Sequence, residues 1–222
     1  MAPAPATPPA RRVVLVSGPP GAGKSTLAGP LAAELGFALL GKDRIKETLH
    51  EVLGAPAGPD APGGPDAPAG PGTRAGTNRP HDCSPPGTPG VSREWSSQLG
   101  AAAMEVLWAL AADAPAVVLE ANFRRSEYQL GRIRALGGRV VEVYCDCPAA
   151  VAARRFAERA AGSRHPVHVN PTVTLAELAE YGRPLGVGEL VTVDTTAGVD
   201  VPALAGLVRA RLTAADRPAA PA

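Results

Sequence analysis

The sequence is poor in cysteine and lysine and has no long hydrophobic run. Its cysteines, Cys83, Cys145 and Cys147, are odd in number, which excludes a disulfide framework and favours a reducing cytoplasm. No apolar run approaches the roughly 18 residues that cross a bilayer, and residues 1–12 lack the apolar stretch of a secretory signal peptide. The net charge is only +1, so the basic surface that nucleic acid or a membrane would attract is missing.

The motif Cys145-x-Cys147 has no matching second Cys/His pair that would complete a metal site. We therefore expect two small side chains at the end of a buried strand rather than metal ligands.

Proline and glycine are concentrated in one stretch. Residues 54–92 contain ten Pro and nine Gly, and GPDAPG at 58–63 is followed by the near copy GPDAPA. Such a segment cannot offset its own ordering entropy, so we expect a disordered insertion. Two interpretations stay open, an inert expansion in a GC-rich gene and a flexible flap beside the substrate site. Residues 1–11 and 213–222 are expected to be disordered tails, which leaves one domain over 12–212.

Short apolar runs alternate with helical periodicity along this domain. Strands are predicted at 12–17, 37–40, 116–120, 139–144 and 189–193. Helices are predicted at 25–35, 43–53, 93–112, 126–136, 148–161, 174–181 and 201–212. This alternation favours an α/β fold in which helices cover both faces of a five-stranded parallel sheet. The order of the strands is not visible in the sequence.

The helix over 93–112 carries the clearest local signals. Ser92 is expected to be its N-cap. The candidate core residues on this helix are Trp95, Leu99, Val106, Leu107 and Leu110.

A glycine-rich turn follows the first predicted strand and matches G-x-x-x-x-G-K-[ST] in full. Its glycines let successive N–H groups converge on phosphates, and the following helix adds its positive end. Lys24 is predicted to reach the β- and γ-phosphates and Ser25 to ligate Mg²⁺. The predicted nucleotide-binding residues are Gly18, Pro19, Pro20, Gly21, Ala22, Gly23, Lys24, Ser25 and Thr26.

On these residues the chain resembles the small-molecule and nucleotide kinases among the P-loop NTPases. That group includes chloramphenicol phosphotransferases, gluconate kinases, polynucleotide 5′-hydroxyl kinases and zeta toxins. The chain also resembles compact AAA family ATPase proteins of actinobacteria. The shared stretches are GPPGAGKST, LLGKDRIKE, REWSSQLG, VLEANF and RHP. The resemblance covers about 12–212 without the insertion and implies a three-layer sandwich with a small lid.

The resemblance also implies roles around the acceptor. An Asp at the place of Asp43 takes the proton from the acceptor hydroxyl or orients that hydroxyl, although Asp43 could instead be a helix N-cap. Glu120 stands where a Walker-B carboxylate would help to hold Mg²⁺, although it could equally pair with an arginine. From their position on the following loop, Asn122 and Arg124 are candidate substrate contacts.

Four further residues are expected around the nucleotide. In similar nucleoside monophosphate kinases, an Arg at the place of Arg155 packs on adenine and one at the place of Arg159 faces the phosphates. Arg164 would belong to the lid, and Thr195 to the adenine-side loop. A solvated surface position is the alternative for each arginine.

Of the 22 basic residues only Lys24, Lys42 and Lys46 are lysines. Lys46 lies three residues after Asp43, on the same side of the predicted helix. We expect Lys46, or in second place Lys42, to touch the acceptor or the transferring phosphoryl group, with chance survival of two surface lysines as the alternative. The sequence thus predicts an ATP- and Mg²⁺-dependent kinase for a hydroxyl group on a small molecule. A nucleotide-dependent ATPase switch and a polynucleotide 5′-hydroxyl kinase remain alternatives, and the oligomeric state stays open.

Overall fold

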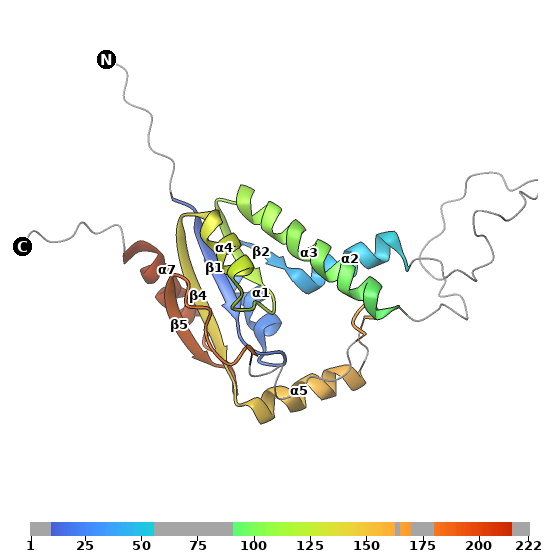
Figure 1. The fold of residues 1–222 in the computed structure, drawn as a ribbon. Coiled ribbons are helices and arrows are strands. Elements are labelled where there is room, and N and C mark those ends of the chain that lie inside the picture. The colour runs from blue at the N-terminus through green and yellow to red at the C-terminus, as the bar shows by residue number, and fades with distance from the viewer. Residues whose placement is uncertain (1–9, 56–90, 163–164, 170–179, 215–222) are drawn as a thin grey trace, which may run out of the picture.

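The computed structural model describes residues 10–55, 91–162, 165–169 and 180–214, in which strands alternate with helices (Figure 1). The strands are β1 (Arg12–Ser17), β2 (Ala38–Gly41), β3 (Ala116–Glu120), β4 (Arg139–Asp146) and β5 (Glu189–Asp194). The helices are α1 (Lys24–Leu35), α2 (Lys42–Leu53), α3 (Arg93–Asp113), α4 (Glu127–Leu136), α5 (Ala149–Ala161) and α7 (Val201–Ala214). The predicted α/β class is confirmed. The helix expected over 174–181 lies almost entirely outside the described residues.

All five strands form one parallel sheet in the order β2-β3-β1-β4-β5. β1 is central because its side chains are apolar on both faces, and Val14 pairs in register with Val118 of β3 and Val141 of β4. The carboxyl ends of the strands therefore meet at one edge of the sheet, where ligands bind in open α/β folds.

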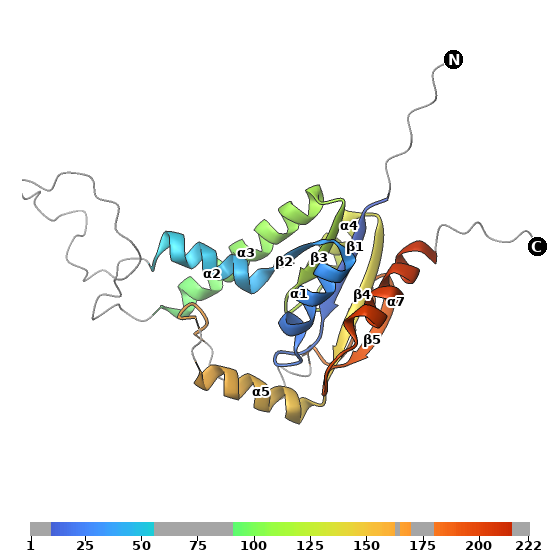
Figure 2. The same cartoon turned by 180° about the vertical axis from the view of Figure 1, so that it is seen from behind.

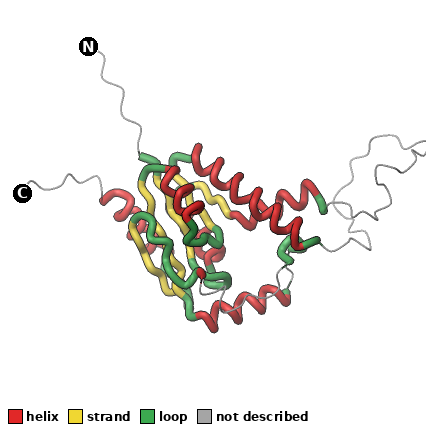
Figure 3. Tube along the Cα trace, in the orientation of Figure 1, coloured by secondary structure: helices red, strands yellow, loops and turns green. Residues whose placement is uncertain are grey.

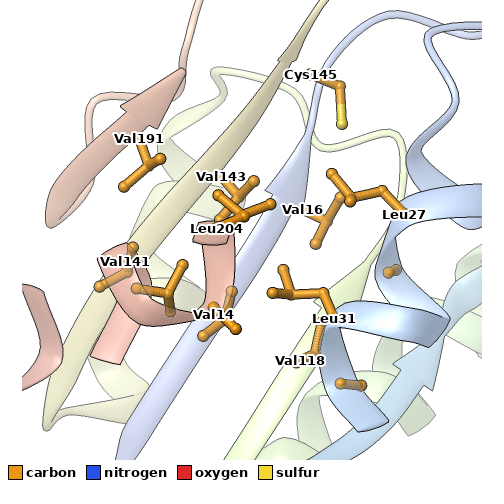
Figure 4. Close-up of a cluster of buried hydrophobic side chains, with 14 of the residues drawn as sticks. Val14, Val16, Leu27, Leu31, Val118, Val141, Val143, Cys145, Val191 and Leu204 are labelled. Carbon is orange, nitrogen blue, oxygen red and sulfur yellow. The ribbon is translucent and has the colours of Figure 1, made fainter. Parts of the chain in front are cut away.

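The side chains of β1 alternate between two hydrophobic cores. Val14 and Val16 pack with Leu31 of α1 and Leu204 of α7 (Figure 4), and Figure 2 shows these two helices on the same face of the sheet. Val13 and Leu15 belong to the other core, which packs against α3 and α4. The tube in Figure 3 shows the sheet between the two helical layers. This three-layer arrangement was expected from the alternation of elements.

The core face of α3 was predicted only in part. Leu99 and Leu107 are buried as expected and Trp95 is half-buried, whereas Val106 and Leu110 are exposed by 37% and 47%. Trp108 is only 2% exposed and is a core residue of α3 that the prediction missed. The sheet covers only one side of α3, and the apolar residues on its other side made the sequence pattern ambiguous. The N-cap prediction is confirmed, because the Ser92 hydroxyl accepts a hydrogen bond from the Trp95 N–H at 3.1 Å.

The described chain extends slightly beyond the predicted domain ends. Arg11, assigned to the N-terminal tail, donates hydrogen bonds to the backbone carbonyls of Ala112, Ala114 and Leu136. At the other end α7 continues to Ala214. The predicted insertion and tails otherwise lie largely outside the described residues. Among the helices that the structure describes, none combines the length and apolar character needed to cross a membrane.

Candidate active site

The glycine-rich loop between β1 and α1 needs a left-handed backbone at three points. Gly18, Gly21 and Gly23 have φ angles of 132°, 84° and 84°, a region that residues with a side chain rarely adopt. The loop also passes close to its neighbours. A Cβ on Gly21 would lie 2.1 Å from the carbonyl oxygen of Ala152 on α5, so the loop and α5 are in direct backbone contact.

Lys24 is the first residue of α1 and is only 5% exposed. Its Nζ donates hydrogen bonds of 2.9 Å to the carbonyl oxygens of Gly18 and Pro19, so the ammonium lies inside the curve of the loop. Burial lowers the pKa of Lys24 to about 8, although the nearby carboxylates of Glu120 and Asp43 oppose the change. This cation is therefore held, at a cost in desolvation, where phosphate oxygens would approach.

Ser25 and Glu120 form the candidate metal pair. The Ser25 hydroxyl donates to Oε1 of Glu120 at 3.1 Å, and Glu120 is 9% exposed at the end of β3. Burial raises the pKa of Glu120, and the charge of Lys24 opposes this. A hydroxyl and a carboxylate are hard oxygen donors that suit Mg²⁺. The described residues include no group of three or more His, Cys, Asp or Glu able to hold a metal, so phosphate and water would have to supply the other ligands.

A cavity of about 350 Å³ lies beside the loop, and its lining includes Gly23, Thr26, Arg155, Arg159 and Thr195. The structure thus brings together residues predicted for the nucleotide site from three distant parts of the chain. Its size is that of a small-ligand pocket.

The two arginines of this cavity differ in what they contact. Arg155 donates hydrogen bonds of 2.8 Å to the carbonyl oxygens of Thr195 and Thr196, and so fastens α5 to the loop after β5. Arg159 is exposed and its guanidinium lies 5.6 Å from the centre of the Phe156 ring. Arg155 therefore shapes the pocket wall, whereas Arg159 is available to a ligand.

Asp43 is the second residue of α2, whose N-cap is Gly41 with no side-chain capping bond. The N-cap interpretation of Asp43 is therefore wrong. Its side chain is 50% exposed and accepts a 3.2 Å hydrogen bond from Lys42. Desolvation of its half-buried side chain would by itself raise the pKa of Asp43, but the charges of Lys42 and His168 hold the pKa below its ordinary value. Asp43 in turn influences the pKa of both Lys24 and Glu120, so the acceptor and phosphate sides are electrostatically coupled.

Lys46 is not on the surface. It is 6% exposed, and its Nζ donates a 2.7 Å hydrogen bond to the hydroxyl of Ser96 on α3. Ser96 donates in turn to the carbonyl oxygen of Val167 at 2.7 Å. Lys46 therefore links α2 and α3 to the segment 165–169, and the alternative of a solvated surface lysine is wrong.

The remaining predicted site residues are Asn122, Arg124 and Arg164. Asn122 is exposed on the loop after β3. Arg124 donates a 2.9 Å hydrogen bond from Nε to the hydroxyl of Tyr181 and lies 3.7 Å from a carboxylate oxygen of Glu180. Arg164 lies outside the described residues.

Sequence reasoning missed a buried carboxylate behind the phosphate loop. Glu142 on β4 is 1% exposed and accepts hydrogen bonds from the Ser17 hydroxyl at 2.6 Å and from the N–H groups of Leu185 and Gly186 at 2.7 and 3.0 Å. It ties the last residue of β1 to a distant turn. A single charged residue inside an apolar strand was the only signal that could have indicated it.

The two cysteines of β4 and its exit are free and buried, as expected for small strand-end side chains. Burial raises the pKa of Cys145 to about 12, which makes its thiol inert. Both side chains belong to the hydrophobic core on the α1 and α7 side of the sheet.

The parallel sheet, the phosphate loop and the flanking cavity define a P-loop nucleotide-binding fold. The sequence from 13 to 184 matches the family model described as AAA domain, so the chain belongs to that family. No curated protein matches the sequence.

Two solved structures are similar in fold. A candidate kinase from Chloroflexus aurantiacus J-10-fl is 27% identical, has a TM-score of 0.66, and the match covers 91% of this chain and 98% of that one. The APS kinase of Mycobacterium tuberculosis, solved with AMPPNP and APS, is 19% identical with a TM-score of 0.50 and coverages of 92% and 99%. The second likeness concerns the fold alone.

Proposed function

We propose that this protein is an ATP- and Mg²⁺-dependent kinase that transfers the γ-phosphoryl group to a hydroxyl of a small molecule. The observation that carries the proposal is the arrangement at the carboxyl edge of the sheet. Lys24, the Ser25–Glu120 pair and Asp43 lie within electrostatic reach of one another, beside a cavity bordered by Arg155 and Arg159. The likeness to a candidate kinase over nearly the whole chain supports the same reaction class.

Each residue of the site has a distinct task in this reaction. The N–H groups of the loop and Lys24 bind the β- and γ-phosphates. Ser25 and Glu120 would hold Mg²⁺, which when bound neutralises phosphate charge. Arg159, exposed beside the cavity, adds a positive charge where the transferring group becomes more negative, a role shared in our proposal with Arg164.

Asp43 acts on the other reactant. Its pKa lies below the ordinary value, so it is ionised at neutral pH and able to accept the proton of the acceptor hydroxyl. Lys46, Asn122 and Arg124 complete the proposed acceptor side. Removing the proton makes the attacking oxygen a better nucleophile toward the γ-phosphorus.

The test is ADP release from ATP and Mg²⁺, with and without a panel of hydroxylated metabolites, antibiotics and a 5′-hydroxyl oligonucleotide. We expect one class of small molecule to stimulate release, and Lys24→Ala and Asp43→Asn to abolish the stimulation while circular dichroism shows an intact fold. Stimulation by the oligonucleotide alone would identify a polynucleotide kinase. ATP turnover that no compound stimulates would identify an ATPase switch and overturn the proposal.

A further inference from the structure

The segment 165–169 follows α5 and lies against the beginning of α3 (Figure 1). Val167 at its centre is 0% exposed, and its carbonyl oxygen accepts the hydrogen bond from Ser96 that continues the chain from Lys46. The backbone N–H of His168 donates to the carbonyl oxygen of His165 at 3.0 Å, which closes a tight turn. The segment therefore docks on the acceptor side of the site in a fixed conformation.

This docking places a histidine against α2. Nε2 of His168 lies 2.9 Å from Oε1 of Glu47, and the two side chains are only 10% and 25% exposed. In the Nε2–H tautomer of His168, Nε2 donates a hydrogen bond to the Glu47 carboxylate. Because little water competes for it, this hydrogen bond is stronger than a surface ion pair.

Glu47 lies one helical turn after Asp43, so the two carboxylates share one side of α2. The three largest effects on the pKa of Asp43 differ in sign. Burial raises it, the charge of Lys42 lowers it, and the charge of His168 lowers it further. His168 thus contacts Glu47 directly and acts on Asp43 through its charge.

A second contact of the same type lies further along the helix. His165 Nε2 is 3.8 Å from Oε1 of Glu51, one turn beyond Glu47 and two turns beyond Asp43. This separation exceeds hydrogen-bond distance, and the Glu51 side chain is 55% exposed. Glu51 therefore provides an internal comparison for Glu47 on the same helix.

We infer that His168 is a positioning residue of the acceptor site. By holding Glu47, it fixes the orientation of α2 and therefore the position of Asp43 on the same side of that helix. The inference rests on the proposed kinase function. Displacing a catalytic group by about 1 Å costs up to a hundredfold in rate, so the hydrogen bond from His168 acts on kcat. ATP binds at the loop and the α5 cavity, so its KM does not depend on this contact.

The first test compares two amides at position 168. In His168→Gln the amide nitrogen falls near the place of Nε2, whereas in His168→Asn the same group ends too short to reach Glu47. Rates are measured as ADP release with ATP and Mg²⁺, alone and with the most stimulating compound of the panel. We expect His168→Gln to keep most of the parent kcat and His168→Asn to lose about tenfold or more, both with the parent KM for ATP.

The second test uses the two glutamates and covers the case in which a variant at position 168 does not fold. Glu47→Gln and Glu51→Gln make the same change one turn apart. We expect Glu47→Gln to lower kcat several-fold and Glu51→Gln to change it less than twofold. Equal kcat values for the Gln and Asn variants at 168, or equal effects of the two glutamate substitutions, would overturn the role of His168.

Failure of the inference is distinguishable from failure of the proposed function. If the parent is stimulated by an acceptor and Lys24→Ala is not, while His168→Asn matches the parent, only the role of His168 is refuted. If the parent binds AMPPNP but no compound stimulates its turnover, the kinase function fails, and the positioning role fails with it.

Discussion

The close contact between the phosphate loop and α5 predicts a specific effect of Gly21→Ala. The added methyl group would have to occupy a point 2.1 Å from the carbonyl oxygen of Ala152, well inside van der Waals contact. The obstacle is backbone, so it cannot rotate away as a flexible side chain would. Either the loop or α5 must move, and α5 carries Arg155 and Arg159.

Two destabilising effects add to the loss of folding free energy in Gly21→Ala. A residue with a side chain in the left-handed region costs roughly 1–2 kcal/mol, and overpacking a tight contact costs about 1–3 kcal/mol. A substitution at Gly36 isolates the backbone effect, because its φ is 70° but a Cβ there would meet nothing within 4 Å. Gly36→Ala should therefore lose only the first amount, equivalent to a few degrees in Tm for a domain of this size.

The assay combines thermal unfolding with titration of AMPPNP. We expect Gly21→Ala to be less stable than Gly36→Ala and to bind AMPPNP at least about tenfold more weakly, roughly 1.4 kcal/mol. Gly36→Ala should bind AMPPNP like the parent. If Gly21→Ala matches Gly36→Ala in both Tm and AMPPNP affinity, the loop does not depend on its contact with α5 and the reasoning is refuted.

Three more outcomes are expected. The folded pKa of Lys24 is lowered to about 8 from 10.5, so the unfolded chain binds more protons between these values and stability rises with pH there. In urea unfolding the parent should therefore gain up to about 3 kcal/mol relative to Lys24→Met across that range, and parallel pH profiles would contradict this. Lys46→Ala should lower kcat/KM at least about tenfold, roughly 1.4 kcal/mol, with AMPPNP affinity nearly unchanged; parent-like kinetics would remove Lys46 from the acceptor side. Glu142→Gln turns an acceptor of three hydrogen bonds into a group that also donates, and should cost about 1–3 kcal/mol by the same unfolding assay, so an unchanged Tm would mean that the turn at 185–186 does not need the carboxylate.

Much of the fold could be predicted because its signals are local. The apolar runs, the glycines of the phosphate loop and the Ser92 cap each act within a few residues of the chain, so strands, helices and Lys24 could be placed from the sequence. The same local pattern failed on α3, where Val106 and Leu110 are exposed. Periodicity gives the spacing of an apolar face but not which of two apolar sides the sheet covers.

The sequence by itself determined the element order, the phosphate loop and the candidate residues along it. The tertiary structure decided the strand order, the burial of Lys46 and the pairing of His168 with Glu47. That pair is separated by 121 positions, and neither residue carries a local mark of the other. Such contacts form only when the sheet and its helices pack together, since burial and hydrogen bonding between distant segments depend on the whole fold.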